Sequence, residues 1–271
     1  MRFWRRWGRR DSAGLLAGWG WSGLAEVGLT ASAVAFRSRF WVLTGIFVLG
    51  FAVPWERWFD LDGGRTTWLL LAAWMARNGW LSFSGATIAV LLLGTACAIA
   101  AAAIRTWATA YLGGGVMQDT KMRGASVVAE GPYRYLRNPL YVGTWLNALA
   151  LAMLTPPSGA VFAIVSVTAF LLVLMRGEES FLMGELGEAY AEYRRLVPRL
   201  APALRARVKA GGTRPRWAQA VVAEIYLWGV AGSFAVLGWR YNAFLLTKCV
   251  LVSVGVSMVA RAFTRESKTA S

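Results

Sequence analysis

Polar side chains that could bind a small ligand gather in two segments of this otherwise apolar chain. The first segment, residues 105–138, ends in Arg137 and Asn138, which come directly before Pro139. Asn-Pro is typical of a helix start, with asparagine as the N-cap and proline as the first helical residue. The positive end of the helix dipole, a guanidinium and an amide would together bind a carboxylate. The alternative is that Asn138 only starts the helix, while Arg137 and Tyr141 anchor it among lipid headgroups.

The second segment, residues 176–202, contains the adjacent acids Glu178 and Glu179. Neighbouring residues on a helix point about 100° apart, so one carboxylate can face a ligand while the other faces solvent or pairs with an arginine. A carboxylate facing a ligand would accept hydrogen bonds from ribose hydroxyls or from an ammonium group. The ordinary interpretation is that charged residues simply end a membrane span. Residues 180–195 are predicted to form an amphipathic helix along the membrane surface, because apolar side chains recur at helical spacing.

The composition excludes several classes of chemistry. With no histidine in the chain, a zinc site, a Ser-His-Asp triad, a Cys-His dyad and histidine-bound haem are excluded, and we expect no metal. Cys97 and Cys249 fall in apolar runs, which favours two buried thiols. The triple glycine at 113–115 lacks the strand that a dinucleotide-binding fingerprint needs, so we interpret it as a flexible joint.

Long uncharged runs place these residues in a membrane protein. The chain is 57% hydrophobic, only 16% charged and contains 15 tryptophans, so it is unlike a soluble domain of 271 residues. We predict an all-α fold, a polytopic membrane helix bundle with about six transmembrane helices plus cytoplasmic interfacial helices. Residues 66–76 are too few to cross and are predicted to form an interfacial or re-entrant helix. The predicted spans are 40–54, 84–104, 139–155, 158–175, 225–237 and 243–260.

The positive charges predict the topology of these spans. With the N-terminus inside, the cytoplasmic segments carry 24 of the 29 Lys and Arg residues and the outer segments carry 4. This asymmetry follows the positive-inside rule and predicts that both termini are cytoplasmic. The net charge of +15 is then expected to meet anionic lipid headgroups, and no nucleic acid. Residues 1–10 are predicted to be a membrane-surface anchor, and 11–36 an amphipathic helix on the bilayer.

The turn Pro156-Pro157-Ser158-Gly159 predicts that the third and fourth spans are antiparallel neighbours. Their cytoplasmic ends must then meet, which brings Arg137, Asn138 and Tyr141 close to the two glutamates. Composition and spacing therefore predict a ligand pocket at the cytoplasmic membrane surface.

The ordered motifs resemble a known family. GPYRYLRNPLYVG at 131–143, a helical hairpin, the Glu-Glu pair and GEAYAEYRRLVPRLAP at 187–202 resemble the isoprenylcysteine carboxyl methyltransferase family and its relatives, the membrane phospholipid N-methyltransferases. The resemblance covers about residues 104–202. It implies a methyltransferase that uses S-adenosylmethionine and holds this cofactor in a membrane helix bundle.

Carried over by position, the family's motifs suggest which residues act. The resemblance implies that Arg137, Asn138 and Tyr141 are catalytic and that 105–202 is a methyltransferase-like core with a cytoplasmic cofactor site. From the charged and apolar segments, we expect a cytoplasmic basic N-terminal segment at 1–39, N-terminal spans at 40–104, and a C-terminal transmembrane hairpin and tail at 203–271. The implied cofactor-binding residues are Tyr133, Arg137, Asn138, Pro139, Tyr141, Gly143, Glu178, Glu179, Tyr193 and Arg194.

One departure from the family bears on the acceptor, because Asn138 stands where the family motif has histidine. An amide does not titrate near neutral pH, so this side chain cannot act as a general base. We therefore expect carboxyl O-methylation of a membrane lipid or lipidated acceptor, of the isoprenylcysteine type, since a carboxylate is already ionised. The alternatives are a phospholipid N-methyltransferase, an NADPH-dependent reductase of the membrane sterol type, and an inactive cofactor-binding membrane protein.

Overall fold

The computed structural model describes residues 38–39, 41–52, 65–112 and 129–266, and the regular structure in this part of the chain is entirely helical. The predicted all-α fold is therefore confirmed for these residues. The predicted anchor at 1–10, the amphipathic helix at 11–36 and the glycine joint at 113–115 lie outside them.

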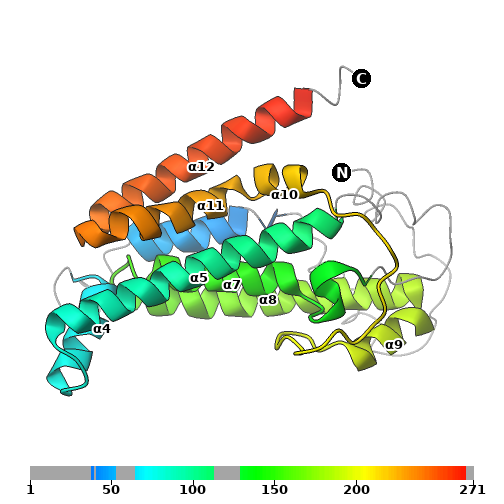
Figure 1. The fold of residues 1–271 in the computed structure, drawn as a ribbon, viewed down its shortest axis with the longest axis horizontal. Helices are drawn as coiled ribbons and strands as arrows, with labels where there is room; N and C mark the ends of the chain where they lie inside the picture. The colour runs from blue at the N-terminus through cyan, green and yellow to red at the C-terminus, as the bar shows by residue number, and fades with distance from the viewer. Residues whose placement is uncertain (1–37, 40, 53–64, 113–128, 267–271) are drawn as a thin grey trace, which may run out of the picture.

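Helices of unequal length build the bundle (Figure 1). A short helix, Trp41–Ala52, precedes α4. Figure 1 shows α5, α7 and α8 running alongside one another, with α11 and α12 on one side and α4 at the far end of α5. The elements are α4 (Thr67–Arg77), α5 (Phe83–Leu112), the 3-10 helix η1 (Gly131–Arg134), α7 (Pro139–Ala152), α8 (Pro157–Leu186), α9 (Glu188–Leu196), α10 (Trp217–Ala223), α11 (Ile225–Gly232), the π-helix η2 (Ser233–Leu237), the 3-10 helix η3 (Gly238–Arg240) and α12 (Ala243–Glu266).

The lengths of these helices do not confirm six crossings. Within the described residues, α5, α8 and α12 are long and apolar enough to span a bilayer. The pair α10–α11 adds a fourth span if the two are counted as one helix, but it bends by 66° at its break. The predicted third span is α7, whose 14 residues extend about 21 Å, against about 30 Å for a hydrocarbon core.

The outer surfaces of the long helices are apolar, as an integral membrane protein requires. Val161 and Val165 on α8 are exposed, and so are Leu251 and Val252 on α12. Lipid can cover such side chains, whereas water would leave them unfavourably solvated.

The core forms where α5 packs on α7 and on the C-terminal helices. Leu91 of α5, Leu151 of α7 and Phe234 of η2 are among its fully buried side chains. The helix Trp41–Ala52 crosses α8 at two glycines, where a Cβ on Gly159 would lie 2.1 Å from the carbonyl oxygen of Gly50. Only glycine permits this close approach of the two backbones.

The predicted hairpin of α7 and α8 is present, but α8 is longer than expected. It continues past the predicted end of the fourth span to Leu186 and ends at Gly187, whose φ of 52° is typical of a glycine helix end. Helix α9 then starts at Glu188. The prediction of one helix over 180–195 is therefore wrong, because the glycine interrupts it.

Candidate active site

The two polar clusters lie against each other where α7 begins and where the last third of α8 passes it. The Tyr141 hydroxyl donates a hydrogen bond of 2.9 Å to Oε2 of Glu178. Nη1 of Arg137 lies 3.1 Å from Oε1 of Glu179, and the Asn138 amide donates to the same oxygen at 3.4 Å. The predicted proximity of the two clusters is confirmed.

Asn138 is the N-cap residue of α7, as predicted, and Pro139 is the first helical residue. However, the Asn138 side chain makes no capping hydrogen bond. Its amide instead donates to Glu179 and, at 3.4 Å, to the backbone oxygen of Arg199. The residue that starts the helix therefore also connects the two clusters.

Glu179 is the centre of this arrangement and is only 4% exposed. Besides Arg137 and Asn138, it receives hydrogen bonds from Nε of Arg199, at 3.1 Å, and from Nη2 of the same guanidinium. These bonds raise the pKa of Arg199. The buried Glu179 carboxylate is thus paired with two guanidiniums, which fits the expectation that one glutamate pairs with arginine.

Arg199 is the residue that the sequence interpretation missed. The resemblance to the family motif predicted Arg194 as a site residue on α9. The structure places the Arg194 side chain at the exposed surface of that helix. The cation beside Glu179 comes five residues later, from the Val-Pro-Arg sequence after α9 has ended. Its signal in the sequence was weak, because only its place after the proline distinguishes it from its neighbours.

The segment that carries Arg199, residues 197–216, is here named the strap. Its backbone forms three hydrogen bonds with the loop before α7, each of 2.9 Å. The donor and acceptor atoms are Arg137 N and Pro198 O, Ala203 N and Tyr135 O, and Arg207 N and Arg134 O. Figure 1 shows the strap leaving α9 and rising beside the bundle to α10. Two segments about 65 residues apart in sequence thus hold each other in place.

Three tyrosines lie beside the charged cluster. The Tyr193 hydroxyl donates a hydrogen bond of 2.8 Å to the backbone oxygen of Tyr133. The ring centroids of Tyr193 and Tyr190 are 5.9 Å apart. Burial raises the pKa of Tyr133, and the charge of Glu178 raises it further. Burial also raises the pKa of Tyr193, and that of Tyr190 to about 12. All three hydroxyls are therefore protonated at neutral pH.

Two of the predicted site residues in the described part of the chain have buried side-chain atoms without a hydrogen-bond partner. They are the Tyr133 hydroxyl and, on Arg137, the atoms Nε and Nη1. The Nη1 contact with Glu179 is an ion pair without hydrogen-bond alignment. Buried donors are rarely left unpaired in proteins, so these atoms suit a ligand with acceptor oxygens.

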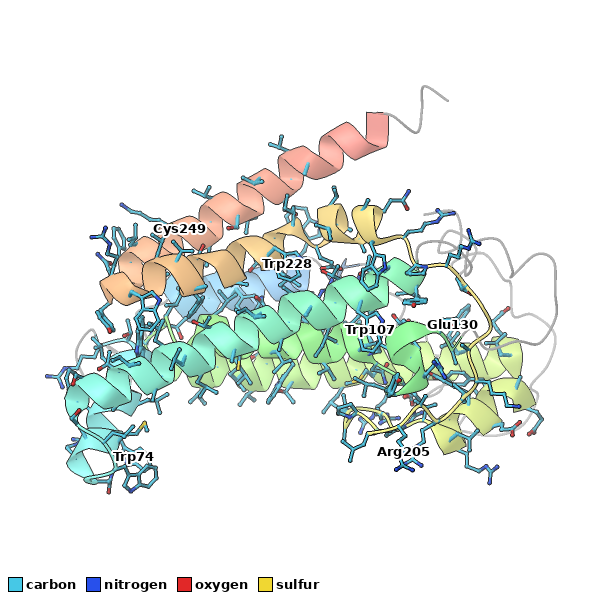
Figure 2. All side chains as sticks on the ribbon, viewed as in Figure 1. Trp74, Trp107, Glu130, Arg205, Trp228 and Cys249 are labelled. Carbon is cyan, nitrogen blue, oxygen red and sulfur yellow. The ribbon has the colours of Figure 1, made fainter. Side chains whose placement is uncertain are left out.

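Gly143, also predicted to bind cofactor, has a packing role. A Cβ on this glycine would lie 2.4 Å from Cγ of Arg105. The Arg105 guanidinium donates to Glu224 at 2.9 and 3.0 Å and to Thr144 at 2.7 Å. This ion pair joins α5 to the break between α10 and α11 (Figure 2 labels Trp107, two residues further along α5).

A metal centre is not indicated for the part of the chain that the structure describes, where no group of three metal-ligating side chains occurs. The arrangement offers cationic donors for a carboxylate, and Glu178 as an acceptor for a hydroxyl or ammonium group.

Comparison with known proteins gives a consistent result. Residues 87–189 match the family described as phospholipid methyltransferase. This range runs from α5 to the start of α9 and includes every predicted site residue except Tyr193 and Arg194. The methyltransferase resemblance read from the motifs is confirmed over this segment.

Individual relatives match over similar lengths. The chain is 36% identical over 90 residues to methanethiol S-methyltransferase 2 of Bradyrhizobium diazoefficiens, covering 33% of this chain and 34% of that protein. It is 41% identical over 70 residues to a methanethiol S-methyltransferase of Crocosphaera subtropica, covering 26% of this chain and 27% of that protein. A cobalt-zinc-cadmium resistance protein of Cupriavidus metallidurans is 33% identical over 102 residues, covering 37% and 43%. The matches thus span less than half the length of each of these relatives, and no solved structure matches.

Proposed function

We propose, from the match of residues 87–189 to the phospholipid methyltransferase family, that this integral membrane protein transfers a methyl group from S-adenosylmethionine to an acceptor that is already ionised. The observation that carries the proposal is the cluster in which Arg137, Asn138 and Arg199 surround Glu179 while Tyr141 binds Glu178.

The groups around the cluster fit this cofactor. S-adenosylmethionine has a carboxylate, an ammonium group and two ribose hydroxyls. The Arg137 atoms that lack hydrogen-bond partners and the Tyr133 hydroxyl would hold the carboxylate, because they are buried donors that need acceptors. The second glutamate, Glu178, has one carboxylate oxygen bound to Tyr141 and would hold the ammonium group or a ribose hydroxyl with the other. When bound, the cofactor supplies an electrophilic methyl group on a sulfonium.

The protein's own contribution is binding and orientation. Glu179 keeps Arg137 in place, since an ion pair buried on both sides resists displacement. Arg199 supplies a second positive charge, so that the cluster of Arg137, Glu179 and Arg199 has a net charge of +1 before Glu178 is counted. Fixed charges in a site shielded from water align the reactants at little reorganisation cost.

The acceptor class is inferred from the residue that stands where the family motif has histidine. The chain contains no histidine, and the amide of Asn138 cannot accept a proton. An acceptor carboxylate needs no deprotonation, so a lipophilic carboxylate of the isoprenylcysteine type is our first candidate. Its oxygen would form the bond to the methyl carbon, and the electron pair of the broken carbon–sulfur bond would remain on sulfur.

A thiol is the second candidate acceptor, because two of the relatives described above are named methanethiol S-methyltransferases. A thiolate is also nucleophilic without a base once it has ionised. The two products differ in a simple test. A methyl ester releases methanol in alkali, whereas a thioether does not.

Binding of the cofactor is the first experiment. Purified protein in detergent should bind S-adenosylmethionine in a calorimetric titration. Arg137→Ala, Glu178→Gln and Glu179→Gln should each lower the affinity about 10- to 100-fold, which is the effect of losing a hydrogen bond to a charged group. Glu188→Gln, on the exposed start of α9, is the matched control and should bind normally.

The second experiment identifies the acceptor. Membranes incubated with cofactor labelled at its methyl group should yield labelled product, which is then divided into alkali-labile and alkali-stable fractions. No binding of cofactor, or binding that none of the three site substitutions alters, would refute the proposal. Binding with no labelled product in any fraction would instead support an inactive cofactor-binding protein.

A further inference from the structure

The strap has an outer surface that the site does not use. Between Tyr193 and Ala223 the sequence contains eight arginines and lysines and no acidic residue. The electrostatic potential of this stretch is therefore strongly positive. One of these cations, Arg199, is engaged with Glu179. The side chains of Arg205, Arg207 and Lys209 are exposed.

Leucines are interleaved with these cations. Leu200 is 43% exposed and Leu204 is 101% exposed, which makes it the most exposed large apolar side chain in the described part of the chain. Both leucines lie on the strap beside the positive charges. A loop that only faces water would not be expected to combine such charges with exposed leucines. A leucine beside arginines is instead typical of segments that lie in a lipid headgroup region, with the apolar side chain inserted and the cations at the phosphates.

The strap presents this surface at the side of the bundle. Figure 1 shows the chain after α9 passing alongside the helices before it rises to α10, and Figure 2 shows Arg205 at the outer edge of this passage. The backbone is held there by the bonds of Ala203 to Tyr135 and of Arg207 to Arg134, on either side of Leu204 and Arg205. The exposed leucine is therefore presented from a fixed segment, and docking would cost little ordering entropy.

We propose that the strap, through Leu200, Leu204, Arg205, Arg207 and Lys209, docks on the anionic lipid surface of the bilayer that holds the helices. Anionic lipid is the occupant that matches both features, since it offers negative phosphates and apolar chains at one depth. A second copy of this chain would instead place two positive surfaces together. The acidic surface of another protein would match the charge but is not already within reach, as the surrounding bilayer is.

The inner and outer sides of the strap are one segment. Arg199 points to Glu179 and Leu200 follows it directly. Docking of the outer side therefore holds Arg199 in the charged cluster, and anionic lipid should tighten whatever ligand this cluster binds. This last consequence rests on the proposed function, whereas the docking itself does not.

The experiment uses the full chain in lipid nanodiscs, made either of phosphatidylcholine or of an equal mixture with phosphatidylglycerol. Cys97→Ala and Cys249→Ala remove the two native thiols. Leu204→Cys then carries an environment-sensitive fluorophore. Glu192→Cys, at an exposed position on α9, is the matched control, because it carries the same fluorophore outside the strap.

The Leu204 probe should be shifted to the blue, shielded from iodide and quenched by lipids with brominated chains, more so in the mixed bilayer. Neutralising Arg205, Arg207 and Lys209 to glutamine should lower the docking equilibrium about fivefold per cation, equivalent to about 1 kcal/mol each.

The proposal is overturned if iodide quenches the Leu204 probe as strongly as the Glu192 probe in both bilayers. The proposal is also overturned if the shielding of the Leu204 probe from iodide changes neither when the anionic lipid is left out nor when the three cations are neutralised. Shielding that appears only in discs containing two protein copies would assign the surface to a second copy. Because these measurements need no cofactor, they are independent of the outcome for methyl transfer.

Discussion

The ion pair between Arg105 and Glu224 should be a principal support of the bundle. Glu224 is 6% exposed and accepts three hydrogen bonds, two from Arg105 and one of 2.8 Å from Thr109. The side chain of Arg105 is 26% exposed, so some solvent reaches its guanidinium. Glu224→Gln keeps the shape of the carboxylate but leaves the partly buried Arg105 guanidinium without a counter-charge.

The cost can be estimated from these contacts. Breaking a buried pair by removing one partner costs about 3 to 5 kcal/mol. Because Arg105 is partly solvated, we expect the lower limit, about 3 kcal/mol. At about 2 to 4 °C per kcal/mol for a chain of this size, the thermal midpoint should fall by about 6 to 12 °C.

Thermal unfolding in one detergent, followed by tryptophan fluorescence, measures this loss. Glu188→Gln, which removes an exposed carboxylate on α9, should leave the midpoint unchanged. The double variant Arg105→Met, Glu224→Met should recover most of the stability, since an apolar pair of similar volume replaces a buried ion pair at little cost. The reasoning fails if Glu224→Gln unfolds like the parent protein, or if the double variant is no more stable than Glu224→Gln.

Three further predictions use the same unfolding assay. Gly143→Ala should lower the free energy of unfolding by about 1 to 3 kcal/mol, because its Cβ would overlap Arg105. Gly184→Ala on α8 is the control: its Cβ would meet nothing within 4 Å, so this variant should not be destabilised. Equal effects of the two substitutions would contradict the packing role of Gly143. Tyr193→Phe should cost about 1 kcal/mol by removing the 2.8 Å hydrogen bond to a backbone oxygen in η1, and no change would mean that water replaces it. Burial raises the pKa of Tyr190 from 10.0 to about 12, so the folded protein holds this proton more tightly than the unfolded chain. Stability from this group should be complete below pH 10.0 and be lost between pH 10.0 and about pH 12, and Tyr190→Phe should remove that part of the alkaline loss.

The pairing of the two site clusters was predictable from the sequence. Two prolines and a short turn at 156–159 require α7 and α8 to be antiparallel, so Tyr141 and Glu178 had to approach each other. This inference depends only on local turn chemistry and on the connection length. It therefore did not need the rest of the fold.

The charge partners within the cluster were less predictable. Arg194, Arg195 and Arg199 are all arginines of one short segment, and motif position favoured the first. The structure selects Arg199, because the strap turns back along the loop before α7 through long-range backbone bonds. No local pattern encodes those bonds.

Local sequence patterns predict that the chain forms apolar helices, that proline and glycine mark their ends, and that the two polar segments meet at one end of a hairpin. These properties follow from hydropathy and backbone chemistry over a few residues. The folded structure was needed to show that α7 is short, that Glu224 is the partner of Arg105, and that Arg199 completes the cluster around Glu179. The physical reason is that a buried charge takes the counter-charge that packing brings within about 3 Å, and packing joins residues more than a hundred positions apart as readily as neighbours.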